Sequence, residues 1–227
     1  MRKMVELIMA LGILAVVLTC GAAWADGPDE IIKDAIAMLN DMAKQDDAED
    51  MAGVLKGAHA VAIVPSMVKA GIILGGEYGE GLILKKEKGK WHGPSFYNLG
   101  GGSLGLQLGA QKISLLMAVT NEKGVEAFLS SKTKLGGDVS VAAGPTGRRV
   151  EAATDAQAKA SIYSWSMTKG LFAGFSLEGS VISISVKHNE QYWKKKMSAA
   201  DALKKPASDK RIQPLLKALA ALEAKAK

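Results

Sequence analysis

The sequence predicts an α+β fold: a curved antiparallel, partly barrel-like β-sheet with an N-terminal amphipathic helix and a short C-terminal helix. Three observations support this prediction. Short apolar runs follow one another from about residue 58 to residue 186, and several of them alternate at period two. Most of the 25 glycines lie among these runs, as expected for turns and close backbone contacts in a sheet. Apolar residues at helical spacing lie mainly near the two ends of the chain.

Residues 1–25 have the organisation of a secretory signal peptide. Arg2 and Lys3 form a positive start, residues 7–25 carry no charge, and Ala23 and Ala25 are the small residues of a cleavage site. We therefore expect an exported, periplasmic protein that is peripheral to the envelope membranes. Two alternatives stay open, namely an uncleaved membrane anchor and a lipoprotein acylated at Cys20.

The mature chain is expected to begin with helices over residues 26–56. Apolar residues recur at steps of three and four from Pro28 to Lys44, and Asp29 and Glu30 favour the N-terminus of a helix. Residues 51–56 suggest a second short helix. Because the polar face of the first helix is acidic, it is expected to cover the core and not a membrane.

Strand-like runs follow, and turn residues separate them. They are residues 58–64, ending at Pro65, and residues 70–76, 81–86, 96–107, 113–120, 136–143 and 161–186. Lys88-Gly89-Lys90 is typical of a hairpin tip, and the β-branched run 180–186 is expected to form the firmest strand. We also expect glycines such as Gly102, Gly105 and Gly174 to be required by close backbone approach or positive φ.

Two further helices are predicted. Asn121 is a suitable N-cap for a short helix over residues 121–130, and Pro214 suits the first turn of an amphipathic helix that contains Leu215 and Leu222. The predicted organisation is therefore a signal peptide (1–25), a helical segment (26–56), a β-rich domain (57–193) and a basic tail with a short helix (194–227).

Positive charge is concentrated at the C-terminal end. Residues 187–227 contain 11 basic and 4 acidic residues, whereas residues 26–186 contain 16 basic and 18 acidic residues. Such a segment attracts anionic partners. We assign Lys194, Lys195 and Lys196 to electrostatic contact with a membrane surface, and export argues against a nucleic-acid partner.

The motifs for enzymatic chemistry are weak. Cys20 is the only cysteine and the three histidines are scattered, so neither cofactor nor metal ligation is expected. The G-x-G-x-x-G match at residues 100–105 is followed by strand-like residues where a dinucleotide site needs a helix. Three S-x-x-K matches, at Ser66, Ser131 and Ser166, leave an undescribed Ser/Lys hydrolase as a minor alternative to a non-enzyme.

A tight turn at residues 144–149 presents Arg148 and Arg149. The turn is open to two interpretations, an ordinary solvated hairpin or a contact with phosphate head groups.

Residues 57–193 resemble the SYLF domain family. The resemblance rests on an ordered set of segments: Ile63-Val64-Pro65, Lys69-Ala70-Gly71, Gly75-Gly76, Gly79-x-Gly81, Trp91 with Gly93-Pro94-Ser95-Phe96, Gly101 to Gly109, Asp138 to Pro145, Ser164-x-Ser166, and Lys169 to Gly179. It implies phospholipid binding, especially of phosphoinositide-type head groups, and no enzymatic activity. Fungal relatives regulate actin.

The functional hypothesis is therefore an exported phospholipid-binding module of the cell envelope. Its partner is an anionic phospholipid surface, with a protein partner also open. Lys69, Arg148, Arg149 and Lys169 are assigned to head-group binding. The alternative is a structural or protein-interaction domain that does not bind lipid.

Overall fold

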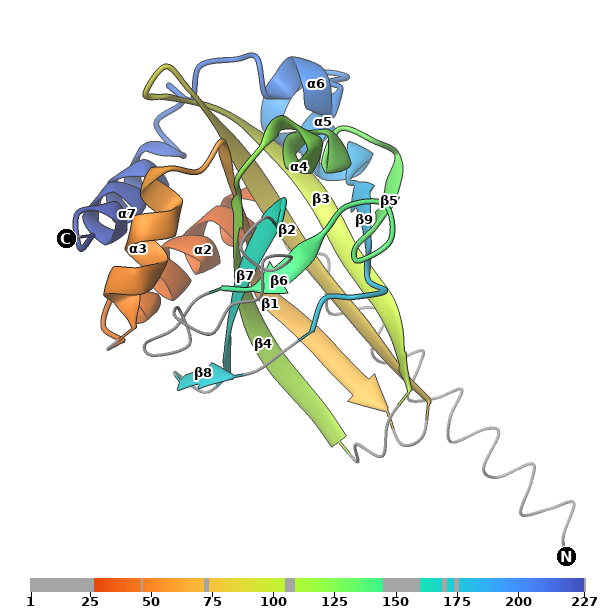
Figure 1. Cartoon of the computed structure of the whole chain (residues 1–227). Coiled ribbons are helices and arrows are strands. Elements are labelled where there is room, and N and C mark those ends of the chain that lie inside the picture. Colours follow the sequence, from red (N-terminus) through yellow and green to blue (C-terminus); the bar gives the residue numbers. More distant parts are fainter. Residues whose placement is uncertain are drawn as a thin grey trace, which may run out of the picture.

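The computed structural model describes residues 27–45, 47–71, 74–104, 109–144, 160–168, 171–173 and 176–226. It confirms the α+β fold class, because a strongly curled sheet carries helices from both ends of the chain (Figure 1). The predicted signal peptide and the Arg148–Arg149 turn lie outside the described residues, as do Gly105, Lys169 and Gly174.

Two helices open the described chain, α2 (Pro28–Met42) and α3 (Ala48–Lys56). The predicted apolar stripe of α2 faces the protein interior, since Ile32, Leu39 and Met42 are buried. This helix covers the core, as its acidic outer face indicated.

Four long strands form the centre of the sheet: β1 (Ala60–Gly71), β2 (Leu74–Glu87), β3 (Lys90–Leu104) and β4 (Gly109–Val119). Five short strands complete it: β5 (Lys132–Lys134), β6 (Val141–Ala143), β7 (Ile162–Thr168), β8 (Leu171–Ala173) and β9 (Val181–Ile184). The strand order is β5-β9-β3-β2-β1-β4-β7-β6, with β8 paired to β7. All pairs are antiparallel except β6–β7.

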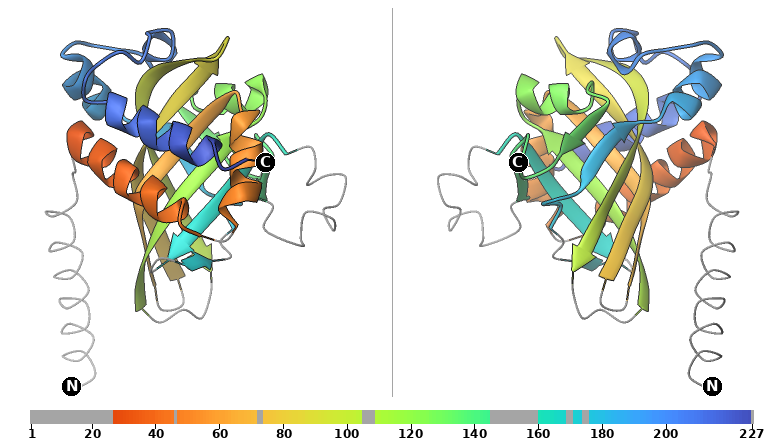
Figure 2. Two further views of the ribbon diagram at one scale, coloured as in Figure 1. Left: turned by 90° about the vertical axis from the view of Figure 1, so that its left-hand side faces the viewer. Right: turned by 90° about the vertical axis from the view of Figure 1, so that its right-hand side faces the viewer.

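The remaining helices are α4 (Glu122–Ala127), α5 (Val186–Trp193), α6 (Ala199–Ala202) and α7 (Gln213–Glu223). Helix α4 starts as predicted, because the Asn121 side chain accepts a hydrogen bond from the Gly124 N–H at 2.9 Å. Helices α2 and α7 run side by side over one face of the sheet (Figure 2).

The sheet separates two apolar clusters. The outer face packs Ile63, Leu82 and Phe96 under α2, α3, α5 and α7, and the inner, concave face packs residues such as Met67 and Tyr97 against α4. Within residues 194–226, Ile212, Leu215, Leu219 and Leu222 belong to the outer cluster. The segment expected as a basic tail with a short helix is thus a packed layer of the fold, although the division of the chain at residue 193 stays a prediction.

Strand β1 does not end at Pro65, which corrects the sequence prediction. Its register with β2 shifts between Ile63 and Ser66, and its register with β4 shifts between Val64 and Met67. A β-bulge therefore accommodates the proline, which has no N–H to donate to a ladder. The strand continues to Gly71 beyond it.

Two other strand predictions are also wrong in extent. The run 180–186 contributes only β9, because Val186 begins α5 and the Asn189 side chain bonds to the backbone N–H and C=O of Phe96 at 3.0 and 2.9 Å. The run 136–143 contributes only β6, since Gly136 has a φ of +78° and the chain turns there.

The close packing that requires a glycine occurs at a different position from those predicted. A Cβ added at Gly102 would have no atom within 4 Å, so that prediction is wrong. At Gly81 on the inner face, a Cβ would overlap the Ile63 carbonyl oxygen and lie 3.0 Å from Cζ of Tyr97. Glycine is needed there because the Tyr97 ring packs close to the backbone.

Candidate anionic-surface interface

A lysine-bearing hairpin forms one end of the sheet. The turn between β2 and β3 has positive φ at Lys88 (+48°) and Gly89 (+76°), which is the geometry of a tight two-residue hairpin. This confirms the hairpin tip predicted from the sequence. The side chains of Lys88 and Lys90 are exposed there.

The loop after α6 docks on this hairpin. The Gly93 N–H donates to the Lys205 carbonyl at 2.8 Å, and the Ala207 N–H donates to the Trp91 carbonyl at 2.9 Å. An isolated bridge also pairs His92 with Pro206. These contacts place the exposed residues Lys204 and Lys205 next to the hairpin, although they follow it by more than 100 residues.

The end of α5 reaches the same region. The Trp193 indole N–H donates to the Pro94 carbonyl at 3.1 Å, and Lys194 ends the helix in the left-handed conformation with φ of +56°. Lys194, Lys195 and Lys196 are exposed just beyond it.

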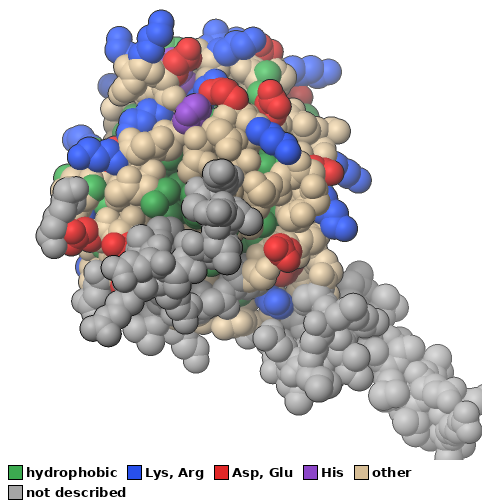
Figure 3. Space-filling model, viewed as in Figure 1, with side chains coloured by type: hydrophobic (Ala, Val, Ile, Leu, Met, Phe, Trp, Pro, Cys, Tyr) green, Lys and Arg blue, Asp and Glu red, His purple; other side chains and the backbone are tan. Residues whose placement is uncertain are grey.

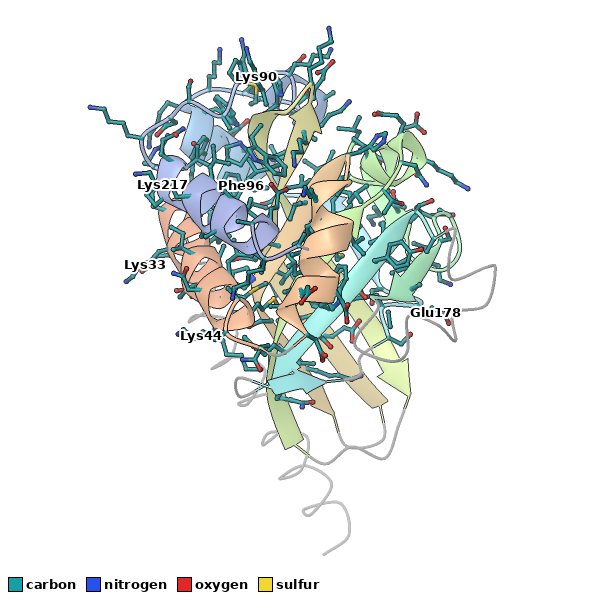
Figure 4. The ribbon with its side chains drawn as sticks, turned by 60° about the vertical axis from the view of Figure 1, so that its left-hand side comes forward. Lys33, Lys44, Lys90, Phe96, Glu178 and Lys217 are labelled. Atoms are coloured by element: carbon teal, nitrogen blue, oxygen red, sulfur yellow. The ribbon has the colours of Figure 1, made fainter. Side chains whose placement is uncertain are left out.

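We call this surface the cationic cap. It consists of Lys88, Lys90, Lys194, Lys195, Lys196, Lys204 and Lys205. Figure 3 shows Lys and Arg side chains gathered at this end of the molecule, and Figure 4 shows Lys90 pointing away from it. The same segments (87–90, 194–196 and 201–205) contain two acidic residues, Glu87 and Asp201, so the net charge is +5.

Few of these charges are neutralised. Among the described cap residues, the ion pair between Lys204 and Asp201 is the one that the structure records, with 4.0 Å between Nζ and Oδ1. Both partners are exposed, so this pair adds little stability. The cap therefore presents a concentrated positive field to solvent.

Two neighbouring lysines have structural roles instead. Lys86 pairs with Glu223 of α7 at 2.8 Å and lies 5.1 Å from the centroid of the Trp91 ring. Lys85 pairs with Glu122 at 3.3 Å, and hydrogen bonds from His59 and Lys85 lower the pKa of Glu122. These pairs fix the hairpin to α7 and α4 and leave the cap lysines as the available charges.

Lys69 lies far from the cap. It is on the inner face of β1, where its Nζ is 4.0 Å from Oε2 of the buried Glu77, whose Oε1 accepts a hydrogen bond from the Ser180 hydroxyl at 2.5 Å. Glu77 pairs with Gly101 of β3, seven residues beyond Pro94, which is roughly 23 Å along the strand. The structure therefore does not bring Lys69 together with Lys194–Lys196.

The first of the three Ser/Lys pairs is not brought together by the fold. Ser66 and Lys69 lie on opposite faces of β1, because an interval of three residues reverses the side chain in a strand. Among residues 27–226 with the gaps given above, no three His, Cys, Asp or Glu side chains group as metal ligands. No helix in the part of the chain that the structure describes is long and apolar enough to span a membrane.

Sequence reasoning assigned Lys194–Lys196 to membrane contact, and the structure places four further exposed lysines beside them. Lys88 and Lys90 were assigned to a hairpin tip without a functional role. The local sequence around Lys204 and Lys205 does not indicate that they lie beside that hairpin, because backbone hydrogen bonds between distant segments place them there.

Comparison with known proteins identifies a family match and several relatives. The family model described as Ysc84, Las17-binding protein actin regulator, matches residues 100–222. An SH3 domain-containing protein of Schizosaccharomyces pombe is 41% identical over 134 residues, which are 57% of this chain and 31% of that protein. The SH3 domain-containing YSC84-like protein 1 of Bos taurus is 33% identical over 154 residues, which are 67% of this chain and 45% of that protein. The LAS seventeen-binding protein 3 of Saccharomyces cerevisiae is 38% identical over 144 residues, which are 62% of this chain and 31% of that protein. The chain thus spans less than half the length of these curated relatives.

Proposed function

The chain belongs to the Ysc84 family of Las17-binding actin regulators, the SYLF-domain family, and we propose that it uses the cationic cap to bind anionic phospholipid surfaces. The observation that supports this proposal is the convergence of seven exposed lysines from three separate segments on one end of the sheet. Because backbone hydrogen bonds hold these segments together, several of the lysines would contact a flat anionic surface at once.

The magnitude of the attraction is sufficient for binding. Each Lys near an anionic membrane contributes about 1 kcal/mol, so three cap lysines correspond to about a 100-fold change in the binding constant. The interaction is screened within about 10 Å at 0.1 M salt, which makes the predicted binding strongly salt-dependent.

We include export in the proposal. The basic start, the uncharged run and the small residues before Asp26 would direct the chain across a membrane, with residues 1–25 removed. The protein would then be peripheral to the envelope membranes. Sequencing the N-terminus of the secreted protein tests this part, and a chain that retains Met1 or carries an acylated Cys20 would contradict cleavage after Ala25.

Co-sedimentation with liposomes tests the function of the cap. The variant K194Q/K195Q/K196Q should bind phosphatidylglycerol vesicles about 100-fold more weakly than the wild type. The matched control K33Q/K44Q/K217Q removes the same charge from α2, the turn that follows it and α7, where these lysines point away from the cap (Figure 4), and should bind nearly normally. Equal losses in the two variants would show a response to net charge alone, and normal binding by the cap variant would refute the role of Lys194–Lys196.

A protein partner is the second candidate function. One relative is named a LAS seventeen-binding protein, and the family match includes residues 194–205 of the cap. An acidic protein segment would be attracted by the same lysines. If wild-type protein binds none of the anionic vesicles, even at low salt, this second candidate replaces the first.

A further inference from the structure

The first residues of β4 form an unpaired edge at the end of the sheet away from the cationic cap. On one side β4 pairs with β1 from Gly109 to Val119, but on its other side β7 pairs with it only from Ser114 onward. Within the part of the chain that the structure describes, no strand pairs with this other side of residues 109–113. Figure 1 shows this end of β4 continuing past β7. We call residues 109–113 the β4 edge.

The backbone polar groups of the β4 edge point away from the sheet. Just beyond the strand, the Thr120 N–H donates to the Ser161 carbonyl on the β7 side at 3.0 Å. Because the N–H and C=O groups of every second residue point to the same side of a strand, the even-numbered residues of β4 direct theirs toward β7. Ala110 and Lys112 therefore direct their N–H and C=O groups out of the β4 edge.

The β4 edge is complementary to itself. In an antiparallel pair of two copies centred on Gln111, Ala110 of each copy lies opposite Lys112 of the other, and each such pair exchanges both backbone hydrogen bonds. This register uses the whole edge and forms about four hydrogen bonds. It also places each lysine opposite an alanine, whereas a register centred on Lys112 would place two like charges opposite each other. The exposed Gln111 side chains, which both donate and accept, would lie opposite each other at the centre.

We propose that two copies of this chain dimerise by pairing their β4 edges, and that the dimer bridges two anionic surfaces. Open strand edges pair readily with other strands, and a two-fold contact closes on itself, so assembly stops at the dimer. The second part of the proposal rests on the proposed function of the cationic cap.

The direction of the strands places the two caps at opposite ends of the dimer. Ala60 of β1 pairs with Lys85 near the β2–β3 hairpin and with Val119 of β4, so the Val119 end of β4 is the cap end. Antiparallel pairing of the β4 edges reverses the direction of the second copy. Each cap is therefore available to a separate surface.

Analytical ultracentrifugation without lipid tests the dimer. An interface of one strand edge is small, and interfaces below about 1,000 Å² are weak and transient. The average mass of the wild-type protein should therefore rise from monomer toward dimer as the concentration increases from about 1 μM to about 1 mM. A protein that stays monomeric over this whole range overturns the proposal.

K112P and K112Q form a matched pair of variants. Both remove the lysine charge, but only proline also removes the outward N–H, which is not part of the ladder with β1. K112P should weaken dimerisation about tenfold or more, because each dimer loses two hydrogen bonds, and K112Q should dimerise like the wild type. Thermal unfolding checks that K112P is folded. Dimerisation of folded K112P with wild-type affinity overturns the proposal.

Disulfide cross-linking tests the register without a proline. Replacement of Cys20, the only cysteine, by serine leaves an introduced thiol as the single one. Facing residues of a non-hydrogen-bonded pair have Cα atoms about 4.5 Å apart, within disulfide range, so Q111C should form covalent dimers on mild oxidation. In K112C the two Cα atoms would be roughly 8 Å apart, which is too far. Cross-linking of K112C as fast as Q111C would overturn the register.

Light scattering of phosphatidylglycerol vesicles tests the bridging. The wild type and K112Q should cluster the vesicles, whereas K112P should sediment with them and leave them dispersed. Equal clustering by K112P and K112Q, or dispersed vesicles with the wild type bound, overturns the bridging. If the wild type binds no vesicles, the proposed function of the cap fails, and the dimer stands or falls on the measurements made without lipid.

Discussion

Replacement of Gly81 by alanine should destabilise the protein far more than the same replacement at Gly102. At Gly81 the new Cβ would overlap the Ile63 carbonyl oxygen and lie 2.9 Å from Cγ2 of Val64 and 3.0 Å from Cζ of Tyr97. The backbone oxygen belongs to a central strand that is paired on both sides, so it cannot move without disturbing two ladders. At Gly102 the new Cβ would meet nothing within 4 Å.

The expected magnitudes follow from packing. Overpacking of a core costs about 1–3 kcal/mol, whereas Gly→Ala at a compatible site stabilises by about 0.4–1 kcal/mol through the unfolded chain. The free energies of unfolding of G81A and G102A should therefore differ by about 1.4–4 kcal/mol. For a chain of this length, each 1 kcal/mol shifts Tm by about 2–4 °C.

Thermal unfolding followed by circular dichroism, together with urea titration, measures the difference. A lower urea midpoint for G81A with an unchanged m value would show a loss of stability without a change in the extent of unfolding. If the free energies of unfolding of both variants lie within about 0.5 kcal/mol of the wild-type value, the packing of Tyr97 over β2 leaves room for a Cβ at Gly81 and the expected overlap is refuted. If G102A is the more damaging variant, the assignment of the two glycines is wrong.

Three further substitutions test other contacts. N121A removes the side-chain acceptor for the Gly124 N–H and should lower the free energy of unfolding by about 1 kcal/mol, measured by urea titration, and a value near zero would contradict the capping role. N189L leaves the buried backbone groups of Phe96 without their side-chain partner and should cost about 2–5 kcal/mol, with N40L on the exposed face of α2 as the control that should change little. D209N tests pH dependence, because hydrogen bonds from Arg211 hold the pKa of Asp209 below its usual value of 3.8. The wild type should be more stable than D209N above about pH 4, and this advantage should disappear as the pH falls through the folded pKa; a stability difference that does not change from pH 7 to pH 2 would rule out the linkage.

The elements that were predicted correctly depend on local interactions. The Asn121 cap bonds to a residue three positions away, and the Lys88–Gly89 turn needs positive φ at adjacent residues. The apolar spacing of α2 is likewise a property of a single segment. Such features are visible in the sequence because their partners are close along the chain.

The elements that were missed depend on distant partners. Val186 was assigned to a strand from its β-branched side chain, yet α5 begins there and turns Asn189 toward Phe96, 93 residues earlier in the chain. The cationic cap depends on the backbone hydrogen bonds between residues 91–93 and residues 205–207, which are more than 100 positions apart in the chain. The helix or strand propensity of a residue carries no information about these contacts.

The position of Lys69 shows that a single β-bulge changes the face on which the later side chains of a strand lie. Val64 and Met67 are both on the inner face, although an odd interval separates them, because the bulge at Pro65 inserts one residue. Every side chain after the bulge is therefore on the opposite face from the one that simple alternation predicts. Lys69 consequently faces Glu77 inside the curled sheet.

The contact between α2 and α7 also constrains the order in which the protein matures. The helix that starts the described chain completes its apolar surroundings with Leu215, Leu219 and Leu222, which follow it by more than 170 residues. A partly synthesised chain therefore carries an unburied α2 stripe and lacks the long-range contacts that close the outer layer. The outer layer cannot close before α7 has been synthesised, so a ribosome-bound chain that ends before residue 213 keeps the apolar stripe of α2 exposed.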